Sequence, residues 1–271
     1  MNLPQVKLNQ GIHVMHLFYR INRVAWAALP ADASVATRRR LEAICAANAN
    51  ASHPRVSLFA NISGKADIAV MILASEMGQA AQLHRDIEFA FPPGVLEPIY
   101  QYFSVTELSE YMSSEDDHRK QLIEREKVAA DSAEFTQKME EFRQRMAEYT
   151  HYRLYPELPD WEVMCFYPMN KRRLGADNWY SLDFPTRKTL MGGHARVGRK
   201  YSGRVTQLIT GSVGLDDWEW GVTLVAKQVD PIKEIVYEMR FDEVTARFGE
   251  FGSFYINLRV TPEALWAHLH L

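Results

Sequence analysis

The chain has 271 residues, of which 47% are hydrophobic and 24% charged, and it contains only 14 glycines and 12 prolines. This composition excludes disordered, collagen-like and low-complexity chains, and the length allows one large domain or two small ones. The net charge of −3 argues against general nucleic-acid binding.

Two features of the sequence bear on where the protein works. Cys45 and Cys165 lie far apart and outside any Cys/His cluster, so they indicate buried thiols, not a disulfide framework or a zinc site. The N-terminus lacks a basic flank followed by an apolar stretch, and the longest apolar run, residues 68–74, is too short to span a bilayer. We therefore expect a cytoplasmic protein without a transmembrane segment.

The first part of the chain alternates segments typical of strands and helices. Ser34 is a suitable N-cap for a helix, residues 64–65 suit a hairpin connection, and Pro92 and Pro93 end a later helix. The predicted elements are a strand at 12–20, a helix at 34–50, strands at 55–63 and 66–75, a helix at 76–91 and a strand at 100–110. Their order is βαββαβ.

The same order returns in the last part of the chain. The predicted elements there are a strand at 161–168, a helix at 185–191, strands at 204–212 and 218–226, a helix at 231–248 and a strand at 251–260. Matching elements are offset by about 150 residues, which predicts an α+β protein of two tandem ferredoxin-like βαββαβ repeats. We expect repeats at 1–112 and 151–271, with two sheets packed face to face or side by side.

The segment between the repeats is predicted to be helical. Residues 114–150 contain no glycine or proline, are dense in charge, and place apolar side chains at helical spacing at Phe135, Met139, Phe142, Met146 and Tyr149. This pattern predicts one long amphipathic connecting helix over 113–150. Since its polar face is rich in acidic residues, we expect the apolar stripe to pack on its own subunit and not on a membrane.

Positive charge is concentrated in one stretch. Residues 171–204 hold nine basic and two acidic side chains, so this stretch carries +7 and the rest of the chain −10. A polyanionic ligand would suit it, and a solvated basic face whose counter-charges come from the fold is an equal alternative.

Dense polar motifs occur in the second repeat only, at 166–173, 191–207 and 237–255, which places the candidate site there and leaves the first repeat a structural role. His194 follows Gly192 and Gly193 at the end of the predicted short helix, where a flat ligand can approach the backbone. No HExxH motif or second close histidine supports a non-haem metal site, whereas haem needs only one axial ligand from the protein. The alternative for His194 is a surface or hydrogen-bonded core histidine.

Tyr167 ends an apolar strand, with Lys171 four residues further on and Arg153 upstream. A phenol beside cations can anchor a carboxylate, donate a proton or be oxidised by a nearby metal, and the alternative is a core tyrosine with a bonded hydroxyl. On physical grounds alone Gln207 points to solvent or to the backbone, and Arg240 pairs with a nearby acid. Acidic residues of that helix are expected on a solvated face. Neither a nucleotide-binding glycine motif nor a GxSxG motif is present.

Taken together, these segments resemble one known family over nearly the whole chain. The stretches that carry the resemblance are YRLYPELP, CFYPMNKRR, DNWY, RKTLM, GRKYSGRV, GSVGLDDWEWGVTL and KEIVYEMRFDEVTARFGEFGSFYI, with weaker matches in HLFY, ISGKADI and SVTELSEY. The chain resembles the coproheme decarboxylases, the peroxide-dependent haem synthases within the chlorite dismutase superfamily, in the branch from Gram-positive bacteria of low genomic G+C.

The resemblance implies a dimeric α/β barrel of the chlorite dismutase type, assembled as a homopentamer. It implies that the second repeat binds Fe-coproporphyrin III (coproheme), which is both substrate and redox centre. Hydrogen peroxide would then drive decarboxylation of two propionates to vinyl groups, with haem b as product. A transient contact with coproporphyrin ferrochelatase is the further partner it suggests.

The resemblance also implies roles for single residues. His194 would be the proximal iron ligand, Tyr167 the catalytic tyrosine that becomes a radical, and Lys171 the residue near the reacting propionate. Gln207 would lie on the distal face of the iron, and Arg240 and Trp220 match motifs without a defined role. The residues implied to contact propionates are Arg153, Tyr167, Pro168, Met169, Asn170, Lys171 and Thr245.

One supporting difference, two departures and two alternatives accompany this assignment. Gln207 stands where chlorite dismutases carry an arginine, which argues against chlorite as substrate. Thr245 stands where serine is usual, and the connecting helix is longer than the family's. A non-enzymatic haem carrier or sensor would need His194 but not Tyr167 and Lys171, and a chlorite-degrading enzyme is the second alternative.

Overall fold

The computed structural model describes residues 3–49 and 53–271. Its first part forms β1 (His13–Ile21), α1 (Arg23–Ala27), α2 (Ala31–Ala47), β2 (Arg55–Asn61), β3 (Ile68–Ala74), α3 (Met77–Ala90) and β4 (Leu96–Thr106). The strands pair in the order β2-β3-β1-β4, which is the ferredoxin-like arrangement expected from the sequence.

The last part forms β5 (Val163–Lys171), α6 (Phe184–Arg199), β8 (Thr206–Gly211), β9 (Trp220–Ala226), α7 (Val229–Met239), α8 (Glu243–Phe248), β10 (Gly249–Phe251), β11 (Tyr255–Arg259) and α9 (Pro262–Leu269). A small excursion after β5 holds β6 (Arg173–Leu174), β7 (Asp177–Asn178) and the 3-10 turn η2 (Trp179–Ser181). Its main strands pair in the order β8-β9-β5-β11, so the second repeat has the topology of the first.

The two sheets join at both edges and close a barrel. β4 pairs with β8 and β11 pairs with β2, all antiparallel, so the ring runs β5-β11-β2-β3-β1-β4-β8-β9 and returns to β5. The face-to-face packing that the sequence left open is therefore wrong, and the repeats lie side by side. Closure satisfies strand edges that each open sheet would otherwise leave unpaired.

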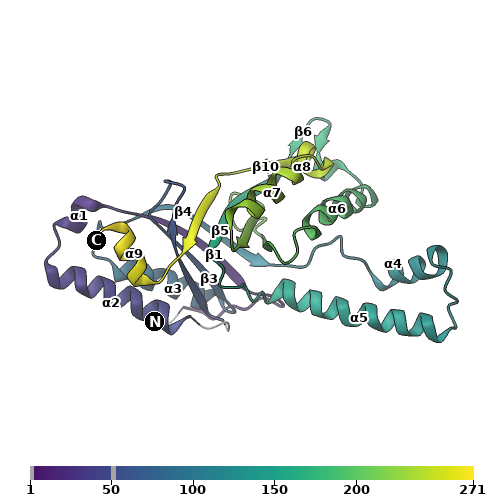
Figure 1. The fold of residues 1–271 in the computed structure, drawn as a ribbon, viewed down its shortest axis with the longest axis horizontal. Helices are drawn as coiled ribbons and strands as arrows, with labels where there is room; N and C mark the ends of the chain where they lie inside the picture. The colour runs from purple at the N-terminus through teal and green to yellow at the C-terminus, as the bar shows by residue number, and fades with distance from the viewer. Residues whose placement is uncertain (1–2, 50–52) are drawn as a thin grey trace.

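Side chains alternate between the barrel interior and its outside. Phe18 and Phe166 face an interior core that receives residues from both repeats. On the outside, α2, α3 and α9 cover the first repeat around Leu41, and α7 covers the second around Leu224, with α6 packed beside α7 (Figure 1). On β5 this alternation places Tyr167 outside the barrel, under the helices of the second repeat.

The segment between the repeats is a helical hairpin and not one long helix. It consists of α4 (Glu115–Lys120), the π-helical turn η1 (Gln121–Arg125) and α5 (Ala133–Leu154), with a turn in which Lys127 has φ 58°. The hairpin projects away from the barrel, so the apolar stripe of α5 has no sheet to cover there (Figure 1). The chain folds back instead, and Leu122 and Val128 pack on Phe135 and Met139.

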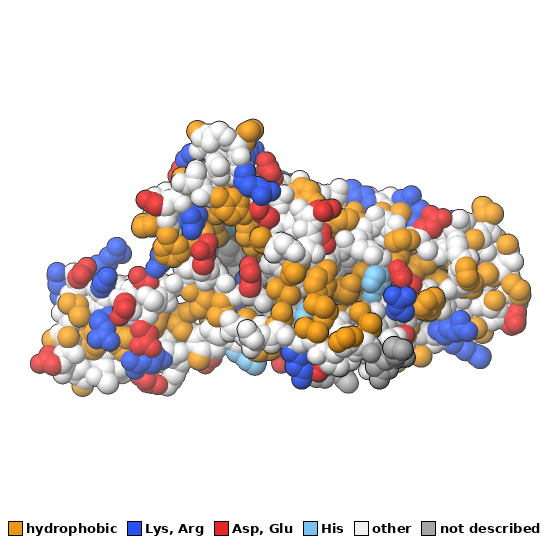
Figure 2. Space-filling view, turned by 180° about the vertical axis from the view of Figure 1, so that it is seen from behind, with side chains coloured by type: hydrophobic (Ala, Val, Ile, Leu, Met, Phe, Trp, Pro, Cys, Tyr) orange, Lys and Arg blue, Asp and Glu red, His pale blue; other side chains and the backbone are white. Residues whose placement is uncertain are grey.

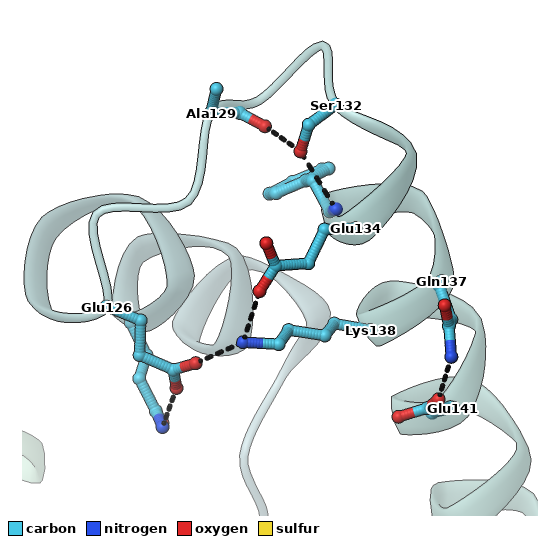
Figure 3. Close-up of polar contacts among 9 residues, drawn as sticks. Glu126, Ala129, Ser132, Glu134, Gln137, Lys138 and Glu141 are labelled. Carbon is cyan, nitrogen blue, oxygen red and sulfur yellow. Dashed lines mark hydrogen bonds and ion pairs between the residues drawn. The ribbon is translucent and has the colours of Figure 1, made fainter.

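Polar contacts hold the hairpin turn (Figure 3). The Ser132 side chain caps α5 by accepting from the Phe135 N–H at 3.1 Å. Lys138 bridges Glu126 at 2.9 Å and Glu134 at 3.0 Å, which ties the turn to the first part of α5. The stripe thus packs within its own chain as expected as far as Phe142, whereas Tyr149 at its far end is exposed. Within the described ranges, no helix combines the length and apolar character needed to cross a bilayer.

Candidate active site

The outer face of β5 carries the predicted tyrosine. Tyr167 is 5% exposed, and its ring stacks on Phe254 with centroids 4.4 Å apart and contacts Phe251 at 5.7 Å. Burial raises the pKa of the phenol, and the neighbouring Arg240 opposes this shift only in part. Tyr167 is therefore a neutral phenol at physiological pH, held between aromatic rings.

Lys171 lies at the end of β5 on the same face. It is 8% exposed, and its ammonium stands 4.8 Å from the centroid of the Trp179 ring. Burial lowers the pKa of Lys171 to about 8, against the opposing attraction of Asp242 and Glu219. Its Nζ forms no ion pair with any described carboxylate, so the charge is available to an anion.

His194 lies within α6 and not at its end. The helix begins at the Asp183 N-cap, whose side chain accepts from the Thr186 N–H at 2.8 Å, and it continues past Gly192 and Gly193 to Arg199. The predicted end at 191 is wrong because packing of α6 against α7 and α8 outweighs the poor helix propensity of two glycines. A methyl group added to Gly192 or Gly193 would meet nothing within 4 Å, so this part of α6 borders open space.

Asp242 holds the His194 ring. Its Oδ2 lies 3.0 Å from His194 Nδ1, and its Oδ1 accepts from the N–H groups of Val244 and Thr245 as the N-cap of α8. Burial favours the neutral acid, but the bonds from His194 and Thr245 lower the pKa of Asp242 below its ordinary value. An ionised carboxylate only accepts, so Nδ1 carries the proton and Nε2 is left with a free lone pair.

Asp242 is the functional residue that sequence reasoning missed, since the acids of 237–255 were expected on a solvated face. The predicted helix at 231–248 is two helices, and Asp242 starts the second. An aspartate two residues before the apolar Val244 is an N-cap signal that marks this break. Thr245, implied to contact a propionate, places its hydroxyl 3.5 Å from His194 Nδ1.

The other predicted residues of the strand end, Asn170, Met169 and Pro168, also make contacts within the protein. The Asn170 side-chain Oδ1 accepts from the Glu219 N–H at 2.7 Å, and Met169 pairs with Phe251 in the ladder. Pro168 packs so closely on Gly252 that a Cβ there would lie 2.6 Å from the proline ring. These contacts fix the backbone between Tyr167 and Lys171.

Three other predicted residues lie around the edge of this site. Arg153, in the last turn of α5, donates to the Ile209 carbonyl at 3.4 Å. Gln207 donates to the Gly198 carbonyl of α6 at 3.3 Å, and Trp220 donates to Glu107 at 3.2 Å.

Arg240 does not form the expected pair with a neighbouring acid in the described part of the chain. Its guanidinium instead lies 4.0 Å from the centroid of Phe251, the ring that also contacts Tyr167.

The fold neutralises most of the basic stretch. Six of its nine cations pair with carboxylates: Arg172 with Asp177 and Glu250, Arg173 with Glu219, Arg187 with Glu110, Lys188 with Asp117, Lys200 with Glu238, and Arg204 with Glu234. The +7 count therefore overstates the charge that a ligand meets. What the stretch contributes to the site is the buried Lys171.

The surface near the site is hollowed. Seen from behind, a hollow lies beneath the lobe that carries β6 (Figure 2). A cavity of about 430 Å³ is lined by residues that include Tyr100, Pro168, Trp218 and Phe251. It adjoins the strand end because Pro168 and Phe251 border both. A second, of about 390 Å³, lies beside Leu190 and Glu243.

The chain matches a known protein family and several solved structures. Residues 35–260 match the family model described as chlorite dismutase. A haem-binding protein from Thermus thermophilus is 33% identical, with a TM-score of 0.78 over 100% of this chain and 99% of that one.

Two more distant structures share the fold. A mutant chlorite dismutase from Candidatus Nitrospira defluvii is 14% identical, with a TM-score of 0.69 and 97% of each chain covered. The chlorite dismutase of that organism in complex with imidazole is 12% identical, with a TM-score of 0.67 and the same coverage.

Proposed function

The chain belongs to the chlorite dismutase family, and we propose that it is a coproheme decarboxylase that uses hydrogen peroxide to convert two propionates of Fe-coproporphyrin III into vinyl groups. The haem-binding relative supports a haem-type ligand. The observation that carries the proposal is the buried pair of Tyr167 and Lys171 on one strand face, near a histidine held by Asp242.

The residues fit an iron porphyrin. His194 Nε2 has no hydrogen-bond partner in residues 3–49 and 53–271, and α6 borders open space at Gly192 and Gly193. Among the same residues no group of three or more His, Cys, Asp or Glu side chains is placed to hold a bare metal ion. Iron would therefore take its other ligands from the porphyrin, with His194 as the axial ligand.

The cations of the candidate site suit propionates. Lys171, Arg153 and Arg240 pair with no carboxylate in the described part of the chain, and charge-assisted hydrogen bonds to a propionate would satisfy them. The Tyr167 to Lys171 segment and Thr245 are the further proposed contacts.

Coproheme, once bound, supplies with peroxide the oxidising power that the protein lacks. Tyr167 would give up a hydrogen atom and then take one from the nearby propionate, because its phenol is neutral and shielded from water. Lys171 would hold that carboxylate until it leaves as carbon dioxide. In total, one propionate, one peroxide and one proton give one vinyl group, one carbon dioxide and two waters.

The identity of Gln207, an amide and not an arginine, favours this reaction over chlorite chemistry. Its amide lies on the outer face of β8 and contacts α6, on the side proposed to be distal to the iron. A neutral amide supplies no fixed positive charge for an inorganic anion, whereas an arginine would.

The test is to mix the protein with Fe-coproporphyrin III, titrate hydrogen peroxide and follow porphyrin masses. Two successive losses of carbon dioxide and two hydrogens, ending at haem b, are expected. Binding without a mass change would identify a haem carrier or sensor instead, and oxygen release from chlorite would identify a chlorite-degrading enzyme.

The wider assignment rests on the family resemblance. It includes a structural first repeat at 1–112, a catalytic second repeat at 151–271, a homopentamer, a cytoplasmic location and a transient contact with coproporphyrin ferrochelatase. The mass of the assembly in solution tests the pentamer independently of the chemistry.

A further inference from the structure

Glu219 is the only buried carboxylate in the described residues, with 7% of its surface exposed. It lies immediately before β9, next to the end of β5. Lys171 is the only buried lysine in the same part of the chain. A buried acid costs free energy unless hydrogen bonds and a nearby cation stabilise it, so its surroundings need an explanation.

Two reciprocal hydrogen bonds join Glu219 to the strand that carries Lys171. Its Oε2 accepts from the Lys171 N–H at 2.9 Å, and its own N–H donates to the Asn170 side chain at 2.7 Å. The β5–β9 ladder ends at Met169 and Trp220, so these bonds extend the junction by two residues. Glu219 thereby fixes the backbone from which the Lys171 side chain leaves.

We propose that Glu219 is a positioning residue that keeps the Lys171 ammonium charged and in place to receive a carboxylate of the ligand. The role toward a ligand rests on the proposed function. The effect of Glu219 on Lys171 does not, and it can be measured without a ligand. Neither the resemblance nor the matching structures assign Glu219 a role.

Two carboxylates on different elements, Asp242 and Glu219, raise the pKa of Lys171. Asp242, at the start of α8, is already bonded to His194 and to the backbone of its own helix. Glu219 has Arg173 as a looser partner at 3.8 Å, and burial together with Glu219 raises the pKa of the adjacent Tyr180. Asp242 raises the pKa of Lys171 more than Glu219 does, but Glu219 also bonds the Lys171 backbone.

The pKa of Lys171 lies close to neutral pH because burial brings it down to about 8. Removing a nearby carboxylate typically lowers the pKa of a cationic partner by roughly 1 unit. Without Glu219, Lys171 would be about half neutral at pH 7 and would attract a carboxylate less.

The test measures Lys171 in the protein without ligand. Lysine labelled with ¹³C at Cε is followed by NMR against pH, with the Lys171 signal assigned by its loss in Lys171→Met. We expect a wild-type midpoint near 8 and a midpoint about 1 unit lower in Glu219→Gln. The matched control is Glu250→Gln, an exposed acid paired with Arg172 on the neighbouring strand, which should leave the midpoint unchanged.

A second variant distinguishes the loss of the carboxylate from misfolding of Glu219→Gln. Glu219→Asp keeps the charge one methylene further away and should shift the midpoint in the same direction by less. An unchanged midpoint in both variants, or an equal shift in Glu250→Gln, overturns the proposal. Since no porphyrin or peroxide is present, this result is independent of whether the protein decarboxylates coproheme.

Binding of metal-free coproporphyrin III gives the functional readout. In Glu219→Gln the affinity should fall about fivefold at pH 8 and recover by pH 6, where Lys171 is charged in both proteins. A loss that is equal at both pH values would show a purely structural role and contradict the proposal.

Discussion

The two repeats share one topology but fill the space between sheet and helix differently. In the first, α2 buries Leu41 against the sheet, and α9 adds Leu265 and Trp266 to the same core. In the second, the corresponding helix α6 buries only Gly198. A candidate site arises where a repeated fold leaves the helix–sheet interface incompletely packed.

The outer faces of the first strands differ in the same sense. β1 presents Leu17, Tyr19 and Ile21 to a closed apolar core, whereas β5 presents Tyr167 and Lys171. Both tyrosines are buried, but only Tyr167 has cations beside it. The chemistry therefore follows from the neighbours of the phenol and not from its burial.

The largest expected effect separates the two tyrosines. Tyr167→Phe should still bind coproheme but lose decarboxylation by roughly 100-fold or more, since no group replaces the phenolic hydrogen. Tyr19→Phe, which removes a buried hydroxyl that has no hydrogen-bond partner within 3–49 and 53–271, should leave turnover unchanged. Porphyrin mass analysis measures both, and normal turnover by Tyr167→Phe would remove that residue from the mechanism.

Packing differences between α2 and α6 predict unequal stability losses. Leu41→Ala should lower the free energy of unfolding by about 2–5 kcal/mol, because it leaves a cavity in a closed core. Val197→Ala on α6, which is half-buried, should cost less than about 1 kcal/mol. Urea denaturation compares the two, and equal losses would mean that α6 is packed as tightly as α2.

Asp242→Asn tests the orientation of His194. Asparagine still caps α8, but it no longer favours a proton on Nδ1, so affinity for ferric coproheme should fall by about 10–100-fold. Asp183→Asn, the same change at the N-cap of α6, is the control and should bind normally. Spectroscopic titration measures the affinities, and equal values for both variants would argue against the Asp242 contact.

The last comparison concerns the barrel that both repeats share. His16 is fully buried, bonded to Thr223 at 2.8 Å, and burial lowers its pKa to about 3. Its unfolded pKa is about 6.5, so the unfolded state binds more protons below that pH and stability falls between pH 6.5 and 3.

Through His16, the free energy of unfolding changes with pH by at most about 1.4 kcal/mol per pH unit. Denaturation of the wild type and of His16→Gln at pH 7 and pH 5 measures it. The variant should lose part of the slope, and an identical pH dependence would exclude His16 as a source. His13, whose pKa burial also lowers, should account for a further part.

Much of the fold follows from local pattern. Strands such as 55–63 and 66–75 are visible as apolar runs around a hairpin, and the observed β2 and β3 lie within them. Closure of the barrel depends on pairings between β4 and β8 and between β11 and β2, which join residues far apart in sequence. Periodicity carries no information on such pairings.

The errors have similar physical causes. In the turn after η1 it is Lys127, and not a glycine, that adopts the left-handed conformation. The sequence over 114–150 therefore contains no glycine that would mark the end of a helix. Helix α6 continues through two glycines because tertiary contacts support it. The role of Asp242 depends on where α8 starts, and the available charge of 171–204 depends on acids elsewhere in the chain, such as Glu234 and Glu238.

The most direct test of the account is a crystal structure of the protein with Fe-coproporphyrin III bound. We predict the porphyrin between α6 and the outer face of β5, with iron bound to His194 Nε2 and one propionate beside Tyr167 and Lys171. A porphyrin bound elsewhere, or one whose propionates all lie away from Tyr167, would contradict the account.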